Sequence, residues 1–133
     1  MPVIIDYGVG NLFSLTSSFK FIGQDVTVTS DKKKIAAADK LILPGVGAFS
    51  DAAKALKETG MYDVVREEAA KGKPLLGICL GMQMLLTKSY EYGEHDGLDL
   101  IPGNVKPIAP IIGSELKVPH IGWNALIFPE DKP

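Results

Sequence analysis

Short apolar runs alternate with amphipathic segments along the first part of the chain, and this alternation constrains the fold more than any other feature. Apolar runs occur at Val3–Ile5, Leu41–Leu43 and Pro74–Ile78, and a β-rich run lies at Asp25–Thr29. Between them, apolar residues recur at helical spacing, as in residues 12–22. Short apolar strands separated by helices are typical of right-handed βαβ units. The sequence therefore predicts an α/β fold, with a doubly wound, mostly parallel sheet and helices on both faces.

The pattern changes after Ser89, where prolines become frequent. Residues 97–103 predict a strand and a turn, and residues 121–128 predict a further strand. Within sheets, proline is confined to edge strands and bulges. We therefore expect antiparallel or edge structure appended to the parallel core, within one domain that spans residues 1–133.

Composition narrows the class of protein. The chain has 133 residues and a net charge of -2, which suits one globular domain and argues against a nucleic-acid-binding surface. A single cysteine cannot form a disulfide within the chain, and Asp6 interrupts the apolar start, so no secretory signal is predicted. No apolar stretch reaches the length needed to cross a membrane. We expect a soluble cytoplasmic protein that binds neither nucleic acid nor membranes.

The only cysteine lies between two glycines, in the segment Gly77–Gln83. The apolar run before it predicts a strand and residues 80–86 predict the start of a helix, which places Cys79 at a strand-to-helix corner. Small neighbours allow a strained turn that exposes a nucleophile, and the positive end of the helix dipole favours the reactive thiolate. A lone cysteine is more often packed in a core, but the paired glycines favour a nucleophile here.

Three glycine-bearing turns, at residues 8–11, 45–47 and 77–81, fall at the carboxyl ends of predicted strands. Ligands of parallel sheets bind at this edge. Each turn alone could merely end a strand, but together they predict one rim of a pocket. The first turn superficially resembles a dinucleotide-binding fingerprint, and we discount that interpretation because Phe13 replaces the third glycine.

Several segments resemble one known family. Pro44–Gly47 followed by Gly77–Gln83 resembles the class I (triad) glutamine amidotransferases. Asp6–Leu12, residues 97–105 and Pro119–Asn124 are similar to the glutaminase subunits of imidazole glycerol-phosphate synthase, in histidine biosynthesis. The resemblance covers nearly the whole chain.

The resemblance implies a catalytic mechanism. Cys79 would attack the side-chain amide carbon of glutamine, giving a thioester, glutamate and ammonia. The resulting oxyanion would be stabilised by the backbone N–H of Leu80 and by one from the turn that contains Val46 and Gly47. This chemistry is expected to need no cofactor and no metal.

The resemblance also implies residues that hold the substrate, namely Gly45, Gly47, Gln83 and Glu91. Gln83 lies one helical turn after Cys79 and can therefore face the same site. Two of these positions have plainer alternatives, because Gln83 could be a solvated helix position and Glu91 could belong to an ordinary polar loop.

The partner that the resemblance implies is a cyclase subunit with a β/α barrel, which consumes the ammonia. Matching segments place Asn11, His120, Trp123 and Asn124 at that interface. Trp123 is the only tryptophan, and core packing within an apolar strand is its alternative role.

One part of the family pattern is absent. The triad histidine and glutamate of the family lie in a His-Pro-Glu motif downstream of the cysteine, and no His-x-Glu occurs in this chain. His95 is expected in an exposed turn, and His120 at the interface. The chain therefore resembles the amino-terminal two-thirds of a glutaminase, and we expect residues 1–133 alone to be inactive.

Three alternatives stay open. The chain could be the glutaminase of another triad amidotransferase, such as a chorismate-using synthase. It could instead be a binding or regulatory module that keeps the fold without turnover, which the missing His-Pro-Glu favours. An α/β-hydrolase with the same elbow is disfavoured, because its acid and histidine partners are equally absent.

Overall fold

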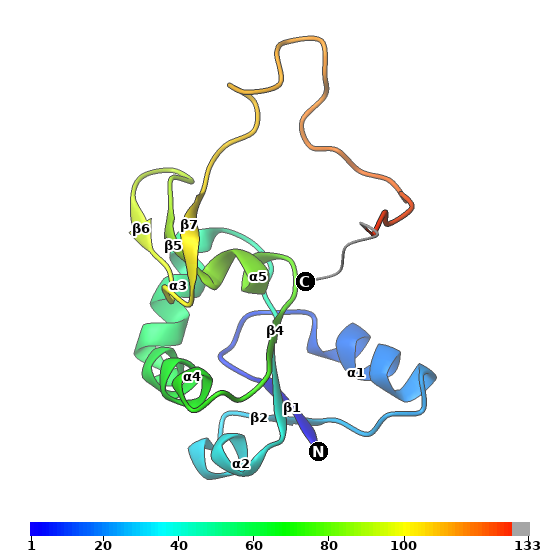
Figure 1. Cartoon of the computed structure of the whole chain (residues 1–133), viewed down its shortest axis with the longest axis vertical. Coiled ribbons are helices and arrows are strands. Elements are labelled where there is room, and N and C mark those ends of the chain that lie inside the picture. Colours follow the sequence, from blue (N-terminus) through cyan, green and yellow to red (C-terminus); the bar gives the residue numbers. More distant parts are fainter. Residues whose placement is uncertain (129–133) are drawn as a thin grey trace.

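A parallel sheet of four strands forms the centre of the computed structural model, which describes residues 1–128 (Figure 1). The strands are β1 (Pro2–Ile5), β2 (Thr27–Thr29), β3 (Lys40–Leu43) and β4 (Leu75–Gly77). Their order is β2-β1-β3-β4 and every pairing is parallel. The predicted parallel α/β sheet is confirmed, while the last five residues of the expected domain lie outside the described part.

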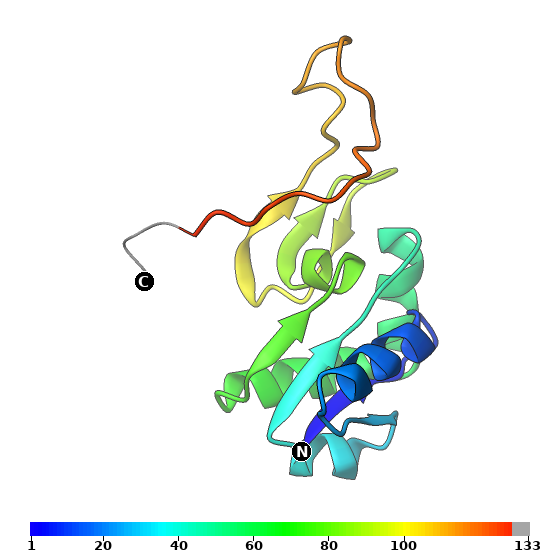
Figure 2. The same cartoon turned by 90° about the vertical axis from the view of Figure 1, so that its right-hand side faces the viewer.

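Helices cover both faces of this sheet (Figures 1 and 2). On one face lie α2 (Lys32–Ala37), α3 (Phe49–Glu58) and α4 (Met61–Ala70), and on the other lies α1 (Leu12–Phe21). Capping residues fix two of the starts, since Asp31 accepts a hydrogen bond from the N–H of Lys33 at 2.8 Å. Asn11 likewise accepts from the N–H of Ser14 at 3.1 Å. Gly60 separates α3 from α4, because this glycine has a φ of 69°.

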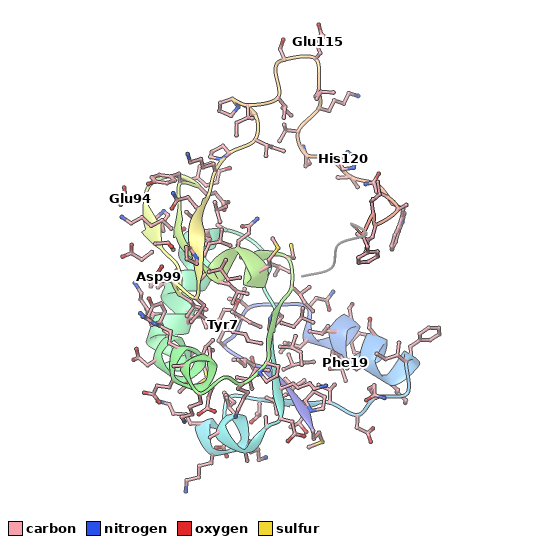
Figure 3. The ribbon with its side chains drawn as sticks, viewed as in Figure 1. Tyr7, Phe19, Glu94, Asp99, Glu115 and His120 are labelled. Atoms are coloured by element: carbon pink, nitrogen blue, oxygen red, sulfur yellow. The ribbon has the colours of Figure 1, made fainter. Side chains whose placement is uncertain are left out.

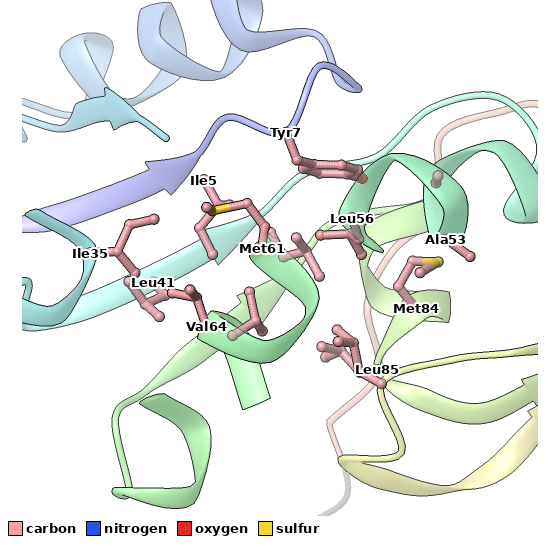
Figure 4. Close-up of a cluster of buried hydrophobic side chains, with 14 of the residues drawn as sticks. Ile5, Tyr7, Ile35, Leu41, Ala53, Leu56, Met61, Val64, Met84 and Leu85 are labelled. Atoms are coloured by element: carbon pink, nitrogen blue, oxygen red, sulfur yellow. The ribbon is translucent and has the colours of Figure 1, made fainter. Parts of the chain in front are cut away.

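The main core lies between the sheet and helices α2 to α4 (Figure 4). Alternate residues of a strand point to opposite faces of a sheet. Residues of β1 and β3 that face these helices are buried with helical side chains, including Ile5, Leu41, Leu43, Ile35, Leu56, Met61 and Val65. The opposite face carries Ile4 and Ile42 toward α1, which has no fully buried residue. The layer formed by α1 is therefore the thinner covering of the two.

A second, smaller sheet follows the parallel one. The short helix α5 (Leu80–Met84) leads from β4 into β5 (Leu86–Ser89), which lies between β6 (His95–Asp96) and β7 (Ile101–Val105). β5 pairs with β6 antiparallel and with β7 parallel. The expectation of antiparallel or edge structure is confirmed, because β6 is antiparallel and both β6 and β7 are edge strands, although β7 pairs in parallel.

The segment before β7 explains both the parallel pairing and the late start of that strand. Residues 97–100 are not a strand, contrary to the prediction. The N–H groups of Leu98 and Leu100 donate to the carbonyls of Met84 and Leu85 at 2.7 and 2.9 Å. The chain is thereby returned to the end of α5, where β5 also begins, so β7 runs in the same direction as β5.

Residues 106–128 form an arm without helix or strand that leaves the two sheets (Figures 1 and 2). The predicted strand at residues 121–128 is wrong, because no strand of the described chain pairs with this segment. Its side chains are exposed, and Trp123 fully so, which also excludes core packing of Trp123 within residues 1–128.

No helix in the described residues has the length and apolar character needed to span a membrane.

Candidate active site

Cys79 occupies a strained corner between β4 and α5. β4 ends at Gly77 and α5 begins at Leu80, and Cys79 between them has a φ of 55° and a ψ of -119°. A positive φ is uncommon for residues other than glycine, and the backbone strain that it causes is found mainly at functional sites. The thiol is exposed. The predicted strand-to-helix elbow is therefore present in the backbone.

The glycines around Cys79 allow helix and strands to meet with no side chain between them. A Cβ placed on Gly77 would lie 2.6 Å from the Cα of Met82, and one on Gly81 would lie 1.9 Å from the carbonyl oxygen of Leu43. Both distances are far below any real contact of a Cβ atom. Close packing of α5 on the ends of β3 and β4, rather than a positive φ, is what these two glycines provide.

The turn after β3 lies directly against the start of α5. A Cβ on Gly45 would be 2.6 Å from the backbone nitrogen of Gly81, and Gly45 is buried. Val46 is exposed, and Gly47 has a φ of 83°. The second glycine turn and the cysteine turn therefore adjoin one another, as their positions at the ends of neighbouring strands predicted.

Backbone donors are available around the elbow. Within residues 1–128, the N–H groups of Val46, Gly47 and Leu80 donate to no backbone or side-chain acceptor. Leu80 is the first residue of α5, so its N–H has no partner inside the helix. Such unpaired amides are the groups that stabilise a developing oxyanion in acyl transfer.

A cavity of about 610 Å³ opens beside the thiol. Its lining includes Gly47, Cys79, Leu80, Gln83 and Glu91, and its size suits a small-molecule ligand. Gly45 and Val46 are not among the lining residues. The structure thus gathers five of the predicted site residues around one space.

Glu91 is fixed in the cavity wall by the start of α3. Its Oε2 accepts a hydrogen bond from the N–H of Phe49 at 3.4 Å, and its own N–H donates to Oγ of the buried Ser89 at 3.2 Å. Ala48, the N-cap of α3, offers no side-chain acceptor. Glu91 therefore does not lie in an unattached polar loop.

The rest of the cavity wall comes from residues that sequence analysis did not assign to the site. They are Tyr92 after β5, Val105–Ala109 at the end of β7, and Val118 and Pro119 in the arm. No local pattern marks these residues, since they reach the cavity only through the course of the second sheet and the arm.

Comparison with known proteins gives the family. The sequence profile of the CobB/CobQ-like glutamine amidotransferase domain matches residues 2–109. The chain belongs to this glutamine amidotransferase family. A crystal structure of a glutamine amidotransferase covers 78% of this chain with a TM-score of 0.66 and 25% sequence identity, and the chain covers 55% of that protein. A putative peptidase E from Listeria monocytogenes shares the fold, with a TM-score of 0.61 at 17% identity over 75% of this chain and 62% of that protein.

Curated relatives of this amidotransferase carry a more specific name. The imidazole glycerol phosphate synthase subunit HisH of Carboxydothermus hydrogenoformans is 50% identical over 129 residues, which is 96% of this chain and 62% of the relative. The subunit of the same name from Sulfurimonas denitrificans is 50% identical over 131 residues, or 98% of this chain and 63% of the relative. The amidotransferase chain thus spans about three-fifths of the length of these relatives.

The residues predicted to meet a partner belong to two segments of the amidotransferase, the start of α1 and the arm. Asn11 is exposed at the start of α1. His120, Trp123 and Asn124 are exposed in the arm, where Nε2 of His120 and Nδ2 of Asn124 are 2.9 Å apart. No hydrogen bond within residues 1–128 joins Asn11 to the arm.

Neither histidine of the amidotransferase chain lines the cavity beside Cys79. His120 lies in the arm (Figure 3). His95 is in β6 and partly buried, which corrects the expectation of an exposed turn. It borders a different cavity of about 360 Å³ with Lys54, Lys57 and other residues, because pairing with β5 draws this segment against α3.

Proposed function

We propose that this amidotransferase domain is the glutaminase of an imidazole glycerol phosphate synthase, which hydrolyses glutamine through Cys79 and supplies ammonia to a cyclase subunit. The observation that carries the proposal is the exposed thiol on a strained elbow, opening on a cavity that Gln83 and Glu91 also line. The two HisH relatives, each 50% identical, support the choice of synthase.

The chemistry follows from the groups around the cavity. The thiolate of Cys79 attacks the side-chain amide carbon of glutamine, and the amide oxygen becomes an oxyanion. The N–H of Leu80 and one from Val46 or Gly47 donate to that oxygen. The nitrogen takes up a proton and leaves as ammonia, and water then hydrolyses the thioester to glutamate and the thiol.

Two side chains of the wall suit the polar ends of glutamine. The amide of Gln83 can donate to and accept from the substrate, and the carboxylate of Glu91 can accept from its α-ammonium group. Gly47 adds a surface without a side chain, on which the substrate can approach the backbone.

Acid–base assistance is the part of this chemistry that the described cavity lining does not supply. No histidine is among those residues, and a positioned acid or base accelerates such steps by roughly 10²–10⁴-fold. Residues 1–133 alone should therefore bind glutamine and hydrolyse it negligibly. The same observation favours a second candidate function, a module that binds glutamine without turnover. Glutamine hydrolysis by a chain in which residues 1–133 are followed by the family's His-Pro-Glu segment would exclude it.

The partner proposal rests on the fate of ammonia. In water ammonia is protonated to a poor nucleophile, so direct transfer to the acceptor enzyme favours the reaction. We propose that Asn11, His120, Trp123 and Asn124 contact the cyclase, in the cytoplasm, where a thiol stays reduced. Trp123→Ala should weaken co-purification with the cyclase subunit and leave glutamine binding unchanged. Retention instead by the partner of a chorismate-using synthase would contradict the assignment.

An electrophilic analogue of glutamine tests the chemistry. In the chloromethyl ketone analogue, a chloromethyl ketone replaces the side-chain amide. The thiolate adds to the ketone carbonyl to give a tetrahedral oxyanion, and the carbonyl re-forms as the sulfur bonds to the chloromethyl carbon and chloride leaves. We expect one adduct, at Cys79, formed faster than the adduct of chloroacetone, which has the same reactive group without the amino-acid groups. Cys79→Ser should form no adduct. Equal rates for the two reagents would contradict the proposal.

A further inference from the structure

A buried tyrosine reaches the turn that adjoins the elbow. Tyr7 follows β1, is 1% exposed, and projects into the core cluster (Figures 3 and 4). Its hydroxyl donates a hydrogen bond to the carbonyl oxygen of Pro44, with 2.7 Å between the two oxygens. The ring is part of the packing of the core, and the hydroxyl alone reaches the turn.

Pro44 is held from two further sides. A Cβ on Gly10 would lie 3.0 Å from the Cβ of Pro44, and a Cβ on Gly81 would lie 3.0 Å from its carbonyl carbon. The first glycine turn and the start of α5 therefore enclose this residue together with the hydroxyl of Tyr7.

The orientation of the Pro44 carbonyl fixes the first peptide group of the turn. A peptide unit is planar, so fixing the carbonyl oxygen also fixes the direction of the N–H of Gly45. The residues that follow, Val46 and Gly47, carry unpaired N–H groups in the turn that adjoins the start of α5. Glycine at positions 45 and 47 leaves this turn many backbone conformations, and an external hydrogen bond selects among them.

We propose that Tyr7 is a positioning residue, whose hydroxyl holds the carbonyl of Pro44 and thereby directs the N–H groups of residues 46 and 47 toward the oxyanion. The inference rests on the proposed glutaminase chemistry. Tyr7 does not line the cavity and does not touch the substrate, so it acts through the turn alone.

The hydrogen bond persists across the working pH range. Burial raises the pKa of Tyr7 to about 12, so the hydroxyl keeps its proton at neutral and mildly alkaline pH. A neutral donor to a backbone carbonyl is a constant support for the turn and does not act as a pH-dependent switch.

Tyr7→Phe keeps the ring and removes the hydroxyl, and Tyr62→Phe is its matched control. The hydroxyl of Tyr62 also donates to a backbone carbonyl, that of Gly97, at 2.9 Å, and Tyr62 is not part of the cavity. Both variants lose a hydrogen bond from a tyrosine hydroxyl to a backbone carbonyl, and Tyr62→Phe also loses a 3.5 Å hydrogen bond from Arg66, but only Tyr7→Phe releases the turn.

Two reagents separate the positioning role from a structural one. The chloromethyl ketone analogue of glutamine develops an oxyanion when the thiolate attacks its carbonyl, whereas iodoacetamide alkylates the thiol without one. We expect Tyr7→Phe to slow labelling of Cys79 by the analogue by about tenfold, less than the 10²–10³-fold of a fully lost oxyanion donor. Labelling by iodoacetamide should change less than about twofold, and Tyr62→Phe should change neither rate.

An analogue rate in Tyr7→Phe equal to or above that of Tyr62→Phe would overturn the inference. If Tyr7→Phe does not fold, Gly10→Ala replaces it, because the new Cβ would press on Pro44. Slower labelling of Cys79 by the analogue, with unchanged labelling by iodoacetamide, would support positioning through Pro44. An unchanged rate of labelling by the analogue would overturn the inference. Failure of the proposed function looks different, because wild type itself would then show no preference for the analogue over chloroacetone.

Discussion

The carboxylate of Glu91 accepts a hydrogen bond from the backbone N–H of Phe49, across 42 positions of sequence, with 3.4 Å between oxygen and nitrogen. Phe49 is the first residue of α3, and the N-cap residue Ala48 has no side-chain acceptor of its own. Glu91 therefore supplies the missing cap and an anion at the positive end of the helix. One side chain thus connects the wall of the cavity to the main core.

Two substitutions at Glu91 separate the cap from the charge. Glu91→Gln keeps an acceptor oxygen and loses the charge, whereas Glu91→Ala loses both. Urea unfolding should show a loss of about 1 kcal/mol for Glu91→Ala and of less than about 0.5 kcal/mol for Glu91→Gln. Both variants should lose the preference for the chloromethyl ketone analogue over chloroacetone, because neither can pair with an α-ammonium group. Equal losses of stability in the two variants would contradict the capping role.

The parts of this fold that sequence patterns predicted are those set by local requirements. β1 and β3 were identifiable because strands buried on both faces need continuous apolar runs, as in Val3–Ile5 and Leu41–Leu43. The elbow was identifiable because α5 approaches the strands too closely for any residue but glycine at positions 77 and 81.

The parts that sequence patterns missed depend on contacts between distant segments. The apolar segment 121–128 predicts a strand, but a strand requires a neighbour, and the described chain offers none. Val105–Ala109 and Pro119 reach the cavity only because β7 returns parallel to β5. The link between Tyr7 and Pro44 is equally non-local, since it joins turns 37 positions apart.

The strained backbone at Cys79 should be measurable as a cost in stability. A residue other than glycine at a positive φ costs of order 1–3 kcal/mol, and the exposed thiol contributes no burial in return. Cys79→Gly should therefore be about 1 kcal/mol more stable than Cys79→Ala in urea unfolding, once the greater freedom of unfolded glycine is subtracted. Met82, exposed in α5, is the matched control, and there glycine should be less stable than alanine by about 1 kcal/mol. If alanine were more stable than glycine at both positions, the result would contradict strain at the elbow.

Close packing at Gly81 predicts a large effect of one added methyl group. The Cβ of Gly81→Ala would fall 1.9 Å from the carbonyl oxygen of Leu43, so α5 or β3 must shift. We expect a loss of more than about 3 kcal/mol in the free energy of unfolding, at the upper end for overpacking. Gly122→Ala is the control, because nothing lies within 4 Å of its Cβ, and its effect should stay within about 0.5 kcal/mol. Similar stabilities of the two variants would contradict the close approach.

The buried carboxylate of Glu68, near the end of α4, predicts a pH dependence of stability. The side chain of Glu68 is buried and lies 2.7 Å from the ammonium groups of both Lys71 and Lys73. Hydrogen bonds from Lys71 and then Lys73 lower the pKa of this carboxyl below its ordinary value. Because the pKa is lower in the folded state, the stabilisation is complete above the pKa of the unfolded carboxyl and is lost as pH falls through the folded pKa.

Glu68→Gln should therefore cost about 2 kcal/mol at pH 7, and the difference from wild type should shrink below about pH 4. Urea unfolding between pH 3 and pH 8 measures this difference in the free energy of unfolding. Glu58→Gln is the control, since its exposed pair with Lys54 at 3.8 Å should contribute less than about 0.5 kcal/mol. A difference for Glu68→Gln that stays constant down to pH 3 would contradict the role of the charge.

Protection of Cys79 by L-glutamine tests most directly whether this cavity is a glutaminase site. The rate of alkylation by iodoacetamide is measured on residues 1–133 at increasing L-glutamine, with L-asparagine as the matched amino acid that is one methylene shorter. We predict that L-glutamine lowers the rate to a plateau and that L-asparagine leaves it unchanged, since the cavity must hold both the amide at the thiol and the α-amino group at Glu91. An alkylation rate that does not respond to L-glutamine, or that falls equally with L-asparagine, would contradict the assignment.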